Sequence, residues 1–282
     1  MEPERLVRNI SDTALWVAYY RALETDRPDA HFRDPFARAL AGERGERIAK
    51  MQTFGDKNAW AFTTRTVLCD RFIDEAVRDG VDLVINLAAG LDARPYRMDL
   101  PKTLRWVEVD LPGILDYKDG LLARATPVCA LERVRLDLSD EDARRTLFSR
   151  LAAGSTRALV VSEGLLIYLS PEQVATLARD LAAQAPFRRW VTDLSSPGLM
   201  KMLSQRDGQA IADAGAPFRF APPEGPDFFK PLGWTPARVN SLLPAAKRLR
   251  RLSFFMRIIA SLPESPQRNP NRPWSAVIEL VR

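Results

Sequence analysis

The chain has 282 residues, of which 46% are hydrophobic and 27% are charged, a composition typical of a globular protein with one large α/β domain or two small ones. Lys and Arg number 41 against 36 Asp and Glu, which gives a net charge of +5. Because the basic residues are scattered along the chain rather than concentrated, we expect no nucleic-acid partner.

The first eighty residues are predicted to be mostly helical. Apolar residues recur at helical spacing in SDTALWVAYYRALETD, residues 11–26. Pro28 and Pro35 interrupt the next stretch, and a second helix is predicted for residues 61–80, where it ends at a glycine. Residues 1–80 therefore form an N-terminal helical cap that we expect to be integral to the domain.

From residue 82 the pattern changes to short apolar strands that alternate with helices. The predicted strands are residues 82–89, 105–112, 133–140, 158–163, 188–196 and a closing strand at 276–282. The alternation predicts an α/β, Rossmann-like, doubly wound fold whose sheet is mostly parallel. We place the closing strand at the edge of the sheet, antiparallel to its neighbour.

Two segments of the predicted core, residues 81–282, have distinct signals. Ser170, with Pro171 after it and Gln173 three residues on, forms a capping box that starts a helix. By contrast, residues 196–234 are rich in Pro and Gly and show few regular signals. We interpret this stretch as an insertion that shapes the substrate site.

Acidic residues follow three consecutive strands, at the carboxyl ends where doubly wound folds bind ligands. Gly90 follows the first strand, and Asp110 ends the second strand twenty residues later, a spacing that suits hydrogen bonds from ribose hydroxyls. Asp137 ends the third strand, where it could accept from an adenine amino group, and Glu163 ends the fourth. Each acid alone could instead cap the helix after its strand. Together they predict a nucleoside site.

The turn after the first strand, Ala88-Ala89-Gly90-Leu91-Asp92, bears on which nucleoside fits. A dinucleotide fingerprint has three glycines, so that a pyrophosphate can lie on the helix start. This turn has one glycine, and Asp92 would repel a phosphate. A cofactor with ribose and adenine but no pyrophosphate fits better, and S-adenosyl-L-methionine is such a cofactor.

With these motifs, the chain resembles the leucine carboxyl methyltransferase-like group of class I S-adenosylmethionine-dependent methyltransferases. This group includes bacterial O-methyltransferases of secondary metabolism. The resemblance covers nearly the whole chain. The matching motifs are TALWVAYYRALETDRPDAHFRDPFARALAG (13–42), TTRT (63–66), AAGLDARPYR (88–97), VEVDLP (107–112), RLDL (135–138), SEGLLIYLSPEQ (162–173) and FFKPLGW (228–234).

The resemblance implies a role for each motif residue of the cofactor site. Arg65 would pair with the methionine carboxylate, and Gly90 would approach the methionine and the ribose. Ala88 belongs to the same loop but departs from the family, whose members usually have glycine there.

The remaining cofactor roles fall to the acidic strand ends. The resemblance implies that Asp110 holds the ribose hydroxyls and that Asp137 and the backbone of Leu138 contact the adenine. Glu163 would lie near the methionine amino group or the sulfonium. These pairings make chemical sense, because a cationic side chain binds a carboxylate. Anionic side chains accept hydrogen bonds from hydroxyl groups and attract a cationic amino or sulfonium group.

The resemblance and the lack of an obvious general base both favour a carboxylate as the methyl acceptor. A carboxylate is already ionised, whereas a hydroxyl acceptor needs a base such as Tyr, Asp or Glu. The one histidine, His31, lies in a proline-bracketed segment and is interpreted as structural. Tyr20 and Tyr168 are the candidate acceptor contacts, with packing in the core as the alternative for each. No catalytic residue is assigned.

The segment KRLRRLSFFMRIIASL, residues 247–262, predicts one amphipathic helix with a solvated basic face. Leu249, Leu252, Met256 and Ile259 would form its apolar face. The alternative is a docking site for an acidic substrate or a carrier protein. A small-molecule acceptor is the expected partner, and the oligomeric state stays open.

Other features bear on location and metals. Cys69 and Cys129 lie far apart in sequence, which suits a cytoplasmic protein with reduced cysteines and fits no zinc motif. A magnesium ion bound by carboxylates stays open, and no metal ligand is assigned. The start of the chain lacks the apolar core of a signal peptide, and no membrane partner is expected. The functions left open are a methyltransferase for a hydroxyl group or a protein carboxylate, an RNA methyltransferase, an inactive nucleoside-binding relative and a dinucleotide oxidoreductase.

Overall fold

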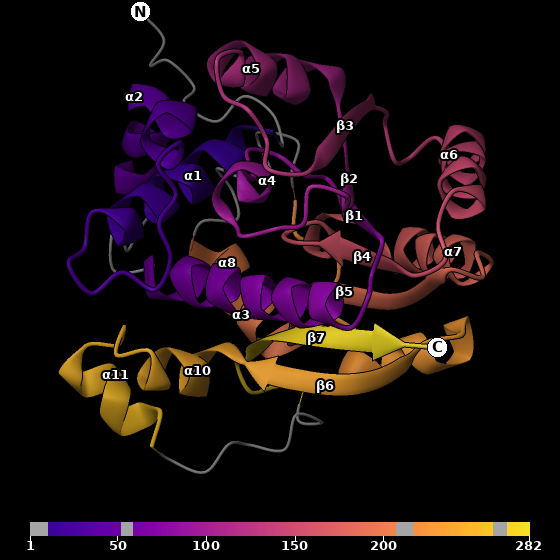
Figure 1. Cartoon of the computed structure of the whole chain (residues 1–282). Helices are drawn as coiled ribbons and strands as arrows, with labels where there is room; N and C mark the ends of the chain where they lie inside the picture. Colours follow the sequence, from indigo (N-terminus) through magenta and orange to yellow (C-terminus); the bar gives the residue numbers. More distant parts are fainter. Residues whose placement is uncertain (1–10, 52–58, 207–216, 262–269) are drawn as a thin grey trace, which may run out of the picture.

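The computed structural model describes residues 11–51, 59–206, 217–261 and 270–282, which form a mixed sheet flanked by helices (Figure 1). The N-terminal cap consists of α1 (Asp12–Thr25), α2 (Ala37–Met51) and α3 (Ala59–Arg78). Both predicted helices of this region are confirmed, and the proline-bracketed residues between α1 and α2 are not helical. Among the described residues, no helix is both long and apolar enough to cross a bilayer.

The described residues form a seven-stranded sheet with the order β3-β2-β1-β4-β5-β7-β6. The strands are β1 (Leu83–Leu87), β2 (Arg105–Asp110), β3 (Ala130–Arg135), β4 (Ala158–Ser162), β5 (Phe187–Ser195), β6 (Thr235–Ser241) and β7 (Ser275–Val281). β1 to β5 pair in parallel, and β7 pairs antiparallel with both β5 and β6. The strand order reverses between β1 and β4, so the predicted doubly wound, mostly parallel sheet is confirmed.

The prediction that the closing strand lies at the edge of the sheet is wrong. β7 lies inside the sheet, between β5 and β6, and its five central residues are buried. The true edge is β6, whose sequence TPARVNS has no apolar run and has a proline at its second position, which an edge strand tolerates. The third strand also lies earlier than predicted, so Asp137 follows β3 by two residues instead of ending it.

Four helices lie between the strands of the parallel part of the sheet. They are α4 (Arg94–Arg97), α5 (Pro112–Leu122), α6 (Glu141–Ala153) and α7 (Pro171–Ala182). The capping box of Ser170 and Gln173 is present at the start of α7. The segment 196–234 is more regular than predicted, because it holds α8 (Pro197–Arg206) and the 3-10 helix η3 (Gly225–Leu232), while residues 207–216 lie outside the described part.

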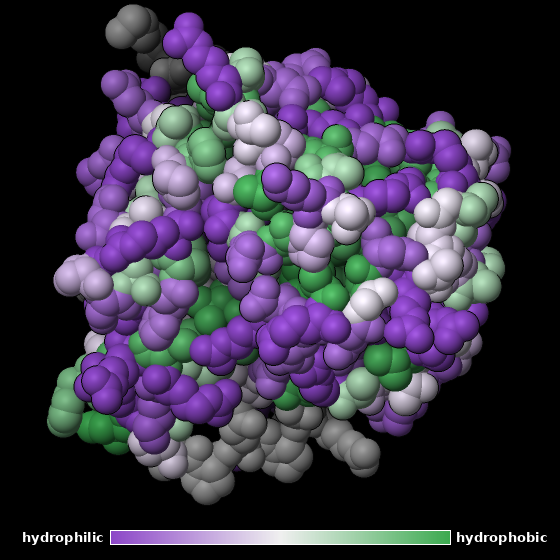
Figure 2. Space-filling view, in the orientation of Figure 1, coloured by the Kyte–Doolittle hydropathy of each residue, from purple (hydrophilic) through white to green (hydrophobic). Residues whose placement is uncertain are grey.

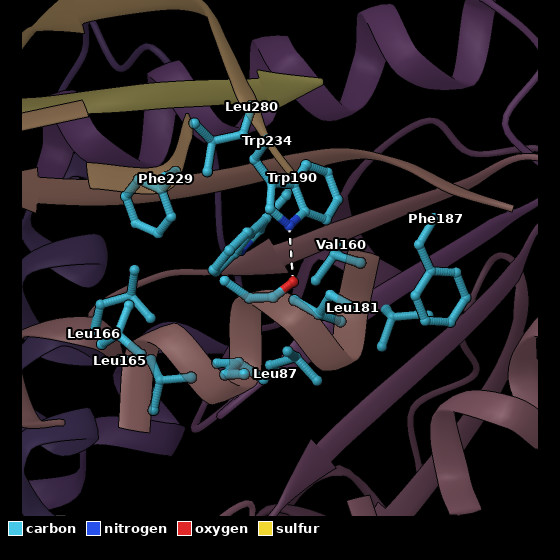
Figure 3. Packing of buried hydrophobic residues seen from close by; sticks show 14 of the residues in the cluster. Leu87, Val160, Leu165, Leu166, Leu181, Phe187, Trp190, Phe229, Trp234 and Leu280 are labelled. Carbon is cyan, nitrogen blue, oxygen red and sulfur yellow. Dashed lines mark hydrogen bonds between the residues drawn. The ribbon is translucent and has the colours of Figure 1, made fainter. Parts of the chain in front are cut away.

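The motif FFKPLGW anchors η3 on the sheet. Phe229 and Trp234 pack edge-on against Trp190 of β5, with ring centroids 5.3 and 5.6 Å apart, respectively (Figure 3). The Trp234 indole donates a hydrogen bond of 2.9 Å to the Ala178 carbonyl of α7. These contacts tie the 196–234 segment to the face of the sheet that α6 and α7 cover.

The basic segment near the C-terminus was predicted as one helix but forms two, α10 (Leu242–Arg248) and α11 (Phe254–Ile259). Arg250 has a φ of 56°. Its N–H donates to the Lys247 carbonyl, and the Arg251 N–H donates to the Ala246 carbonyl, which is the hydrogen-bond pattern of a Schellman helix end. Arginine occupies the position that glycine usually takes, so the sequence contains no stop signal there.

The turn after β1 contains the other non-glycine residue with a positive φ among those described. Ala88 has a φ of 52° and Gly90 has a φ of 48°. The left-handed region favours glycine, because a Cβ there approaches the following carbonyl oxygen. The chain therefore stores strain at Ala88.

We expect Ala88→Gly to raise the free energy of unfolding by about 0.5–1 kcal/mol, because glycine adopts this φ without strain. Ala89→Gly is the matched control, because Ala89 is a buried neighbour without a positive φ. It should lower the free energy of unfolding by roughly 0.5–1 kcal/mol. Denaturant titration measures both. Equal losses in the two variants would contradict the strain at Ala88.

Candidate active site

A cavity of about 1380 Å³ lies at the carboxyl ends of the parallel strands. Its walls come from the turn after β1, the ends of β2, β4 and β5, the loop after β3, and helices α1, α3 and α8. The predicted site residues that line it are Arg65, Ala88, Gly90, Asp110, Asp137, Leu138, Glu163 and Tyr168. The fold thus gathers residues that are up to about one hundred positions apart in sequence.

Asp110 binds the glycine turn directly. Its Oδ2 accepts from the Gly90 N–H at 2.6 Å, and its Oδ1 accepts from the Leu111 N–H at 2.7 Å. Burial raises the pKa of this carboxyl even though the two N–H groups act in the opposite direction. A Cβ on Gly90 would lie 3.1 Å from the Cβ of Ala14, so α1 also packs closely on the turn. Asp110 therefore fixes the turn and presents carboxylate oxygens to the cavity.

Glu163 lies between two arginines. Its Oε1 accepts from Arg65 Nε at 2.9 Å, and its Oε2 accepts from Arg94 Nη2 at 2.8 Å. Burial would raise the pKa of Glu163, but the guanidinium groups of Arg94 and Arg65 lower it to about 2. Glu163 is therefore ionised at neutral pH, and with so low a pKa its carboxylate is a weak base.

Arg94 holds the glycine turn through Asp92, the residue that ends the turn. Arg94 Nη1 contacts Asp92 Oδ2 at 2.7 Å, and Arg94 Nε contacts Asp70 Oδ1 of α3 at 2.6 Å. Arg97 also binds Asp70, at 2.8 Å. Burial raises the pKa of Asp92 but is outweighed by the nearby cations, first Arg94 and then Lys118, and the net shift is downward.

Asp193 of β5 completes this network and was missed from the sequence. Its Oδ2 pairs with Arg65 Nη1 at 3.3 Å, and its Oδ1 accepts from the Gly164 N–H at 2.6 Å. Gly164 has a φ of 71°, and a Cβ there would lie 3.4 Å from the Arg65 guanidinium. The sequence signal for Asp193 is that of a fourth acidic residue close to a strand end. It differs from the other three because it lies within the predicted strand at residues 188–196, not after it.

The network has an excess of negative charge. Its members, linked by contacts of 3.3 Å or less, are the cations Arg65, Arg94 and Arg97 and the anions Asp70, Asp92, Glu163 and Asp193. Three positive groups against four negative ones leave one uncompensated negative charge. Because the groups are largely shielded from water, this charge favours a ligand with a cationic head.

Asp137 and Leu138 lie in the loop between β3 and α6. Asp137 Oδ1 accepts from the Ser139 N–H at 2.9 Å, and the Leu138 carbonyl accepts from Arg144 Nη1 at 2.7 Å. Asp137 is exposed, whereas Leu138 is half-buried. These bonds fix the conformation of the loop, which forms part of the cavity wall.

The two candidate acceptor contacts have different positions. Tyr168 lines the cavity, with its ring 5.9 Å from that of Phe218, and burial raises the pKa of its hydroxyl. Tyr20 is 1% exposed and stacks on Phe62 at 4.7 Å in the helical cap. Among the described residues of α1, Trp16 and Arg21 reach the cavity wall and Tyr20 does not.

His31 has a structural role, as predicted. Its Nε2 lies 2.8 Å from the Leu249 carbonyl, and its backbone N–H donates to Glu24 at 2.7 Å. Within the described ranges His31 is outside the cavity lining, and no group of three or more His, Cys, Asp or Glu side chains is arranged to hold a metal ion.

The chain is similar in sequence to a known enzyme family and to individual proteins named as methyltransferases. Residues 14–182 match the leucine carboxyl methyltransferase family. The chain is 33% identical over 235 residues to a Streptomyces coelicolor protein named as an S-adenosyl-L-methionine-dependent methyltransferase, covering 79% of this chain and 80% of that protein. It is 37% identical over 201 residues to a Rhodococcus jostii protein named in the same way, covering 68% and 65%.

Solved structures with low sequence identity share the fold. A protein of the DUF574 family from Streptomyces avermitilis has a TM-score of 0.56 at 12% identity, covering 94% of this chain and 96% of that one. A Thermobifida fusca protein named as a methyltransferase has a TM-score of 0.55 at 15% identity, covering 98% and 96%. The family match and the two relatives show that the chain belongs to the leucine carboxyl methyltransferase family of S-adenosylmethionine-dependent methyltransferases.

Proposed function

We propose that this protein methylates an oxygen atom of a small-molecule acceptor, most directly a carboxylate of the kind found in polyketides and other secondary metabolites, and that it does so in the cytoplasm. The observation that carries the proposal concerns the side chains that could act as a general base: their pKa values and their positions suit that role poorly. Glu163 has a pKa of about 2, the pKa of Tyr168 is raised, and His31 lies outside the cavity lining of the described residues. An acceptor that is already ionised needs no base.

The cavity residues fit S-adenosylmethionine. This cofactor supplies an electrophilic methyl group on a sulfonium, and its overall charge of +1 matches the single excess negative charge of the arginine–carboxylate network. Asp110 would hold the ribose hydroxyls, and Asp137 and Leu138 would hold the adenine. In the described part of the chain, Arg65 uses Nε and Nη1 for its carboxylate partners, which leaves Nη2 to donate to the methionine carboxylate.

The chain's own contribution to the reaction is positioning. In-line transfer requires the acceptor oxygen to approach along one direction, and such positioning can supply roughly 7–11 kcal/mol of barrier reduction. Trp16, Tyr168 and Phe218 form an apolar part of the cavity wall that would orient an acceptor and exclude water. The cavity exceeds the size usual for one small ligand, which supports simultaneous binding of the cofactor and an acceptor.

A panel of apolar acceptors tests the proposal. We expect label from methyl-labelled S-adenosylmethionine to enter carboxylic acids and to be released as methanol by mild alkali, because methyl esters hydrolyse and methyl ethers do not. Phenols of matched size are the controls. Alkali-stable label on the phenols, with no label on the acids, would contradict a carboxylate acceptor and indicate a hydroxyl acceptor instead.

Asp110→Asn should weaken S-adenosylmethionine binding by a factor of about 10–100, because a hydrogen bond to a charged group contributes about 1.5–3 kcal/mol. Calorimetric titration measures the dissociation constant. Asp116→Asn is the matched control, since Asp116 is an exposed carboxylate of α5 that pairs with Arg135. Equal affinities in the wild type and Asp110→Asn would contradict the ribose contact.

The pH dependence of cofactor binding should follow Asp110. Its pKa lies above the ordinary value of 3.8 because of burial, whereas the pKa of Glu163 is about 2. As the pH falls from neutral, Asp110 takes up a proton first and loses its charge while Glu163 stays ionised. We expect the wild-type affinity to be flat near neutral pH and to fall as the pH drops through the Asp110 pKa. Asp110→Asn should show no such fall, and parallel curves for the two proteins would assign the titration to another group.

A further inference from the structure

Four large apolar side chains project from the short helix α11. Phe254, Phe255, Ile258 and Ile259 are 80%, 69%, 52% and 39% exposed, respectively. Residues four apart lie on the same side of a helix, so Phe254 adjoins Ile258 and Phe255 adjoins Ile259. We call these four residues the α11 patch. Contiguous apolar patches on a protein surface mark interaction sites.

The surroundings of the α11 patch are basic. From Phe228 to Ser261 the sequence contains no Asp or Glu. Lys247, Arg248, Arg250 and Arg257 are all exposed near the patch. Figure 2 shows this corner of the molecule at the lower left, where green side chains lie beside purple ones at the place that Figure 1 gives to α11. A second copy of this chain would bring these cations together, which disfavours self-association through this patch.

Ion pairs of the preceding turn and a helix cap hold α11 in place on the protein. Arg251, in the turn before α11, pairs with Glu24 at 2.8 Å and with Asp29 at 3.0 Å, and its side chain is 5% exposed. The Ser253 side chain caps α11 by accepting from the Met256 N–H. Ser253 and Met256 also line the cavity. The helix therefore presents apolar side chains outward, while its Met256 contributes to the cavity wall.

We propose that the α11 patch docks on an anionic lipid surface. Aromatic and branched aliphatic side chains would enter the interface, while the flanking lysine and arginines would contact lipid headgroups, as in interfacial amphipathic helices. Such contact needs no membrane-spanning segment, so the absence of one in the described residues does not bear on it. The lipid surface would then lie next to the cavity, where an apolar acceptor could enter.

Cosedimentation with vesicles tests the proposal, using phosphatidylcholine alone or mixed with phosphatidylglycerol. We expect the wild type to bind the mixed vesicles about tenfold or more tightly than the neutral ones, and to lose this preference at high salt. Phe254→Ser with Phe255→Ser should weaken binding about tenfold or more through lost apolar contact. Arg248→Gln with Arg250→Gln should weaken only the binding to mixed vesicles.

Leu121→Ser with Arg124→Gln is the matched control, because both residues are exposed at the C-terminal end of α5 or just after it, and α5 lies on the opposite side of the molecule from α11 (Figure 1). It should bind vesicles like the wild type. Cofactor titration shows whether each variant is folded, and it is independent of the lipid result. Failure of the wild type to prefer mixed vesicles would overturn the proposal and leave an acidic protein as the partner of the patch. Unchanged binding by both α11 double variants would also overturn it.

Discussion

The site depends on the burial of Glu163 between Arg65 and Arg94. A buried carboxylate is tolerated only when cations and hydrogen-bond donors surround it, and removing one partner of such a group costs about 3–5 kcal/mol. Glu163 follows β4, Arg65 belongs to α3 and Arg94 follows the turn after β1. One carboxylate thus fixes three segments relative to one another. The motifs TTRT, AAGLDARPYR and SEGLLIYLSPEQ, which are separate in the sequence, are parts of a single ionic structure.

Much of this arrangement could be predicted because its signals are local. Apolar runs and capping residues located β1, β2, β4 and α7, and parallel strands necessarily bring their carboxyl ends to one edge of the sheet. Gly90, Asp110 and Glu163 meet for that reason. Asp193 was missed because it lies within the predicted strand and its pairing with Arg65 spans 128 positions. The place of β7 beside β5 likewise results from long-range pairing that no local pattern encodes.

Helix faces were the least predictable feature. In α1 the buried residues include Trp16, Ala18, Tyr19 and Tyr20, so the helix is covered on most sides and its pattern does not show which side faces the cavity. Trp16 does and Tyr20 does not, although both are aromatic. The break between α10 and α11 had no signal either. Arg250 adopts a conformation that glycine prefers, while the next residue, Arg251, is held by Glu24 on another element.

Two unfavourable features of the protein lie at the same edge of the sheet. Ala88 keeps a left-handed conformation that an L-residue disfavours, and the arginine–carboxylate network retains one uncompensated negative charge. Neither helps the chain to fold, and both face the cavity. Proteins retain local strain and unbalanced charge mainly where a ligand uses them. A ligand that brings a positive charge to this edge would remove one of the two costs on binding, so part of its affinity comes from relieving the protein's own electrostatic imbalance. The residues that hold the turn together would therefore also favour a ligand with a positive charge, as the proposed binding of S-adenosylmethionine requires.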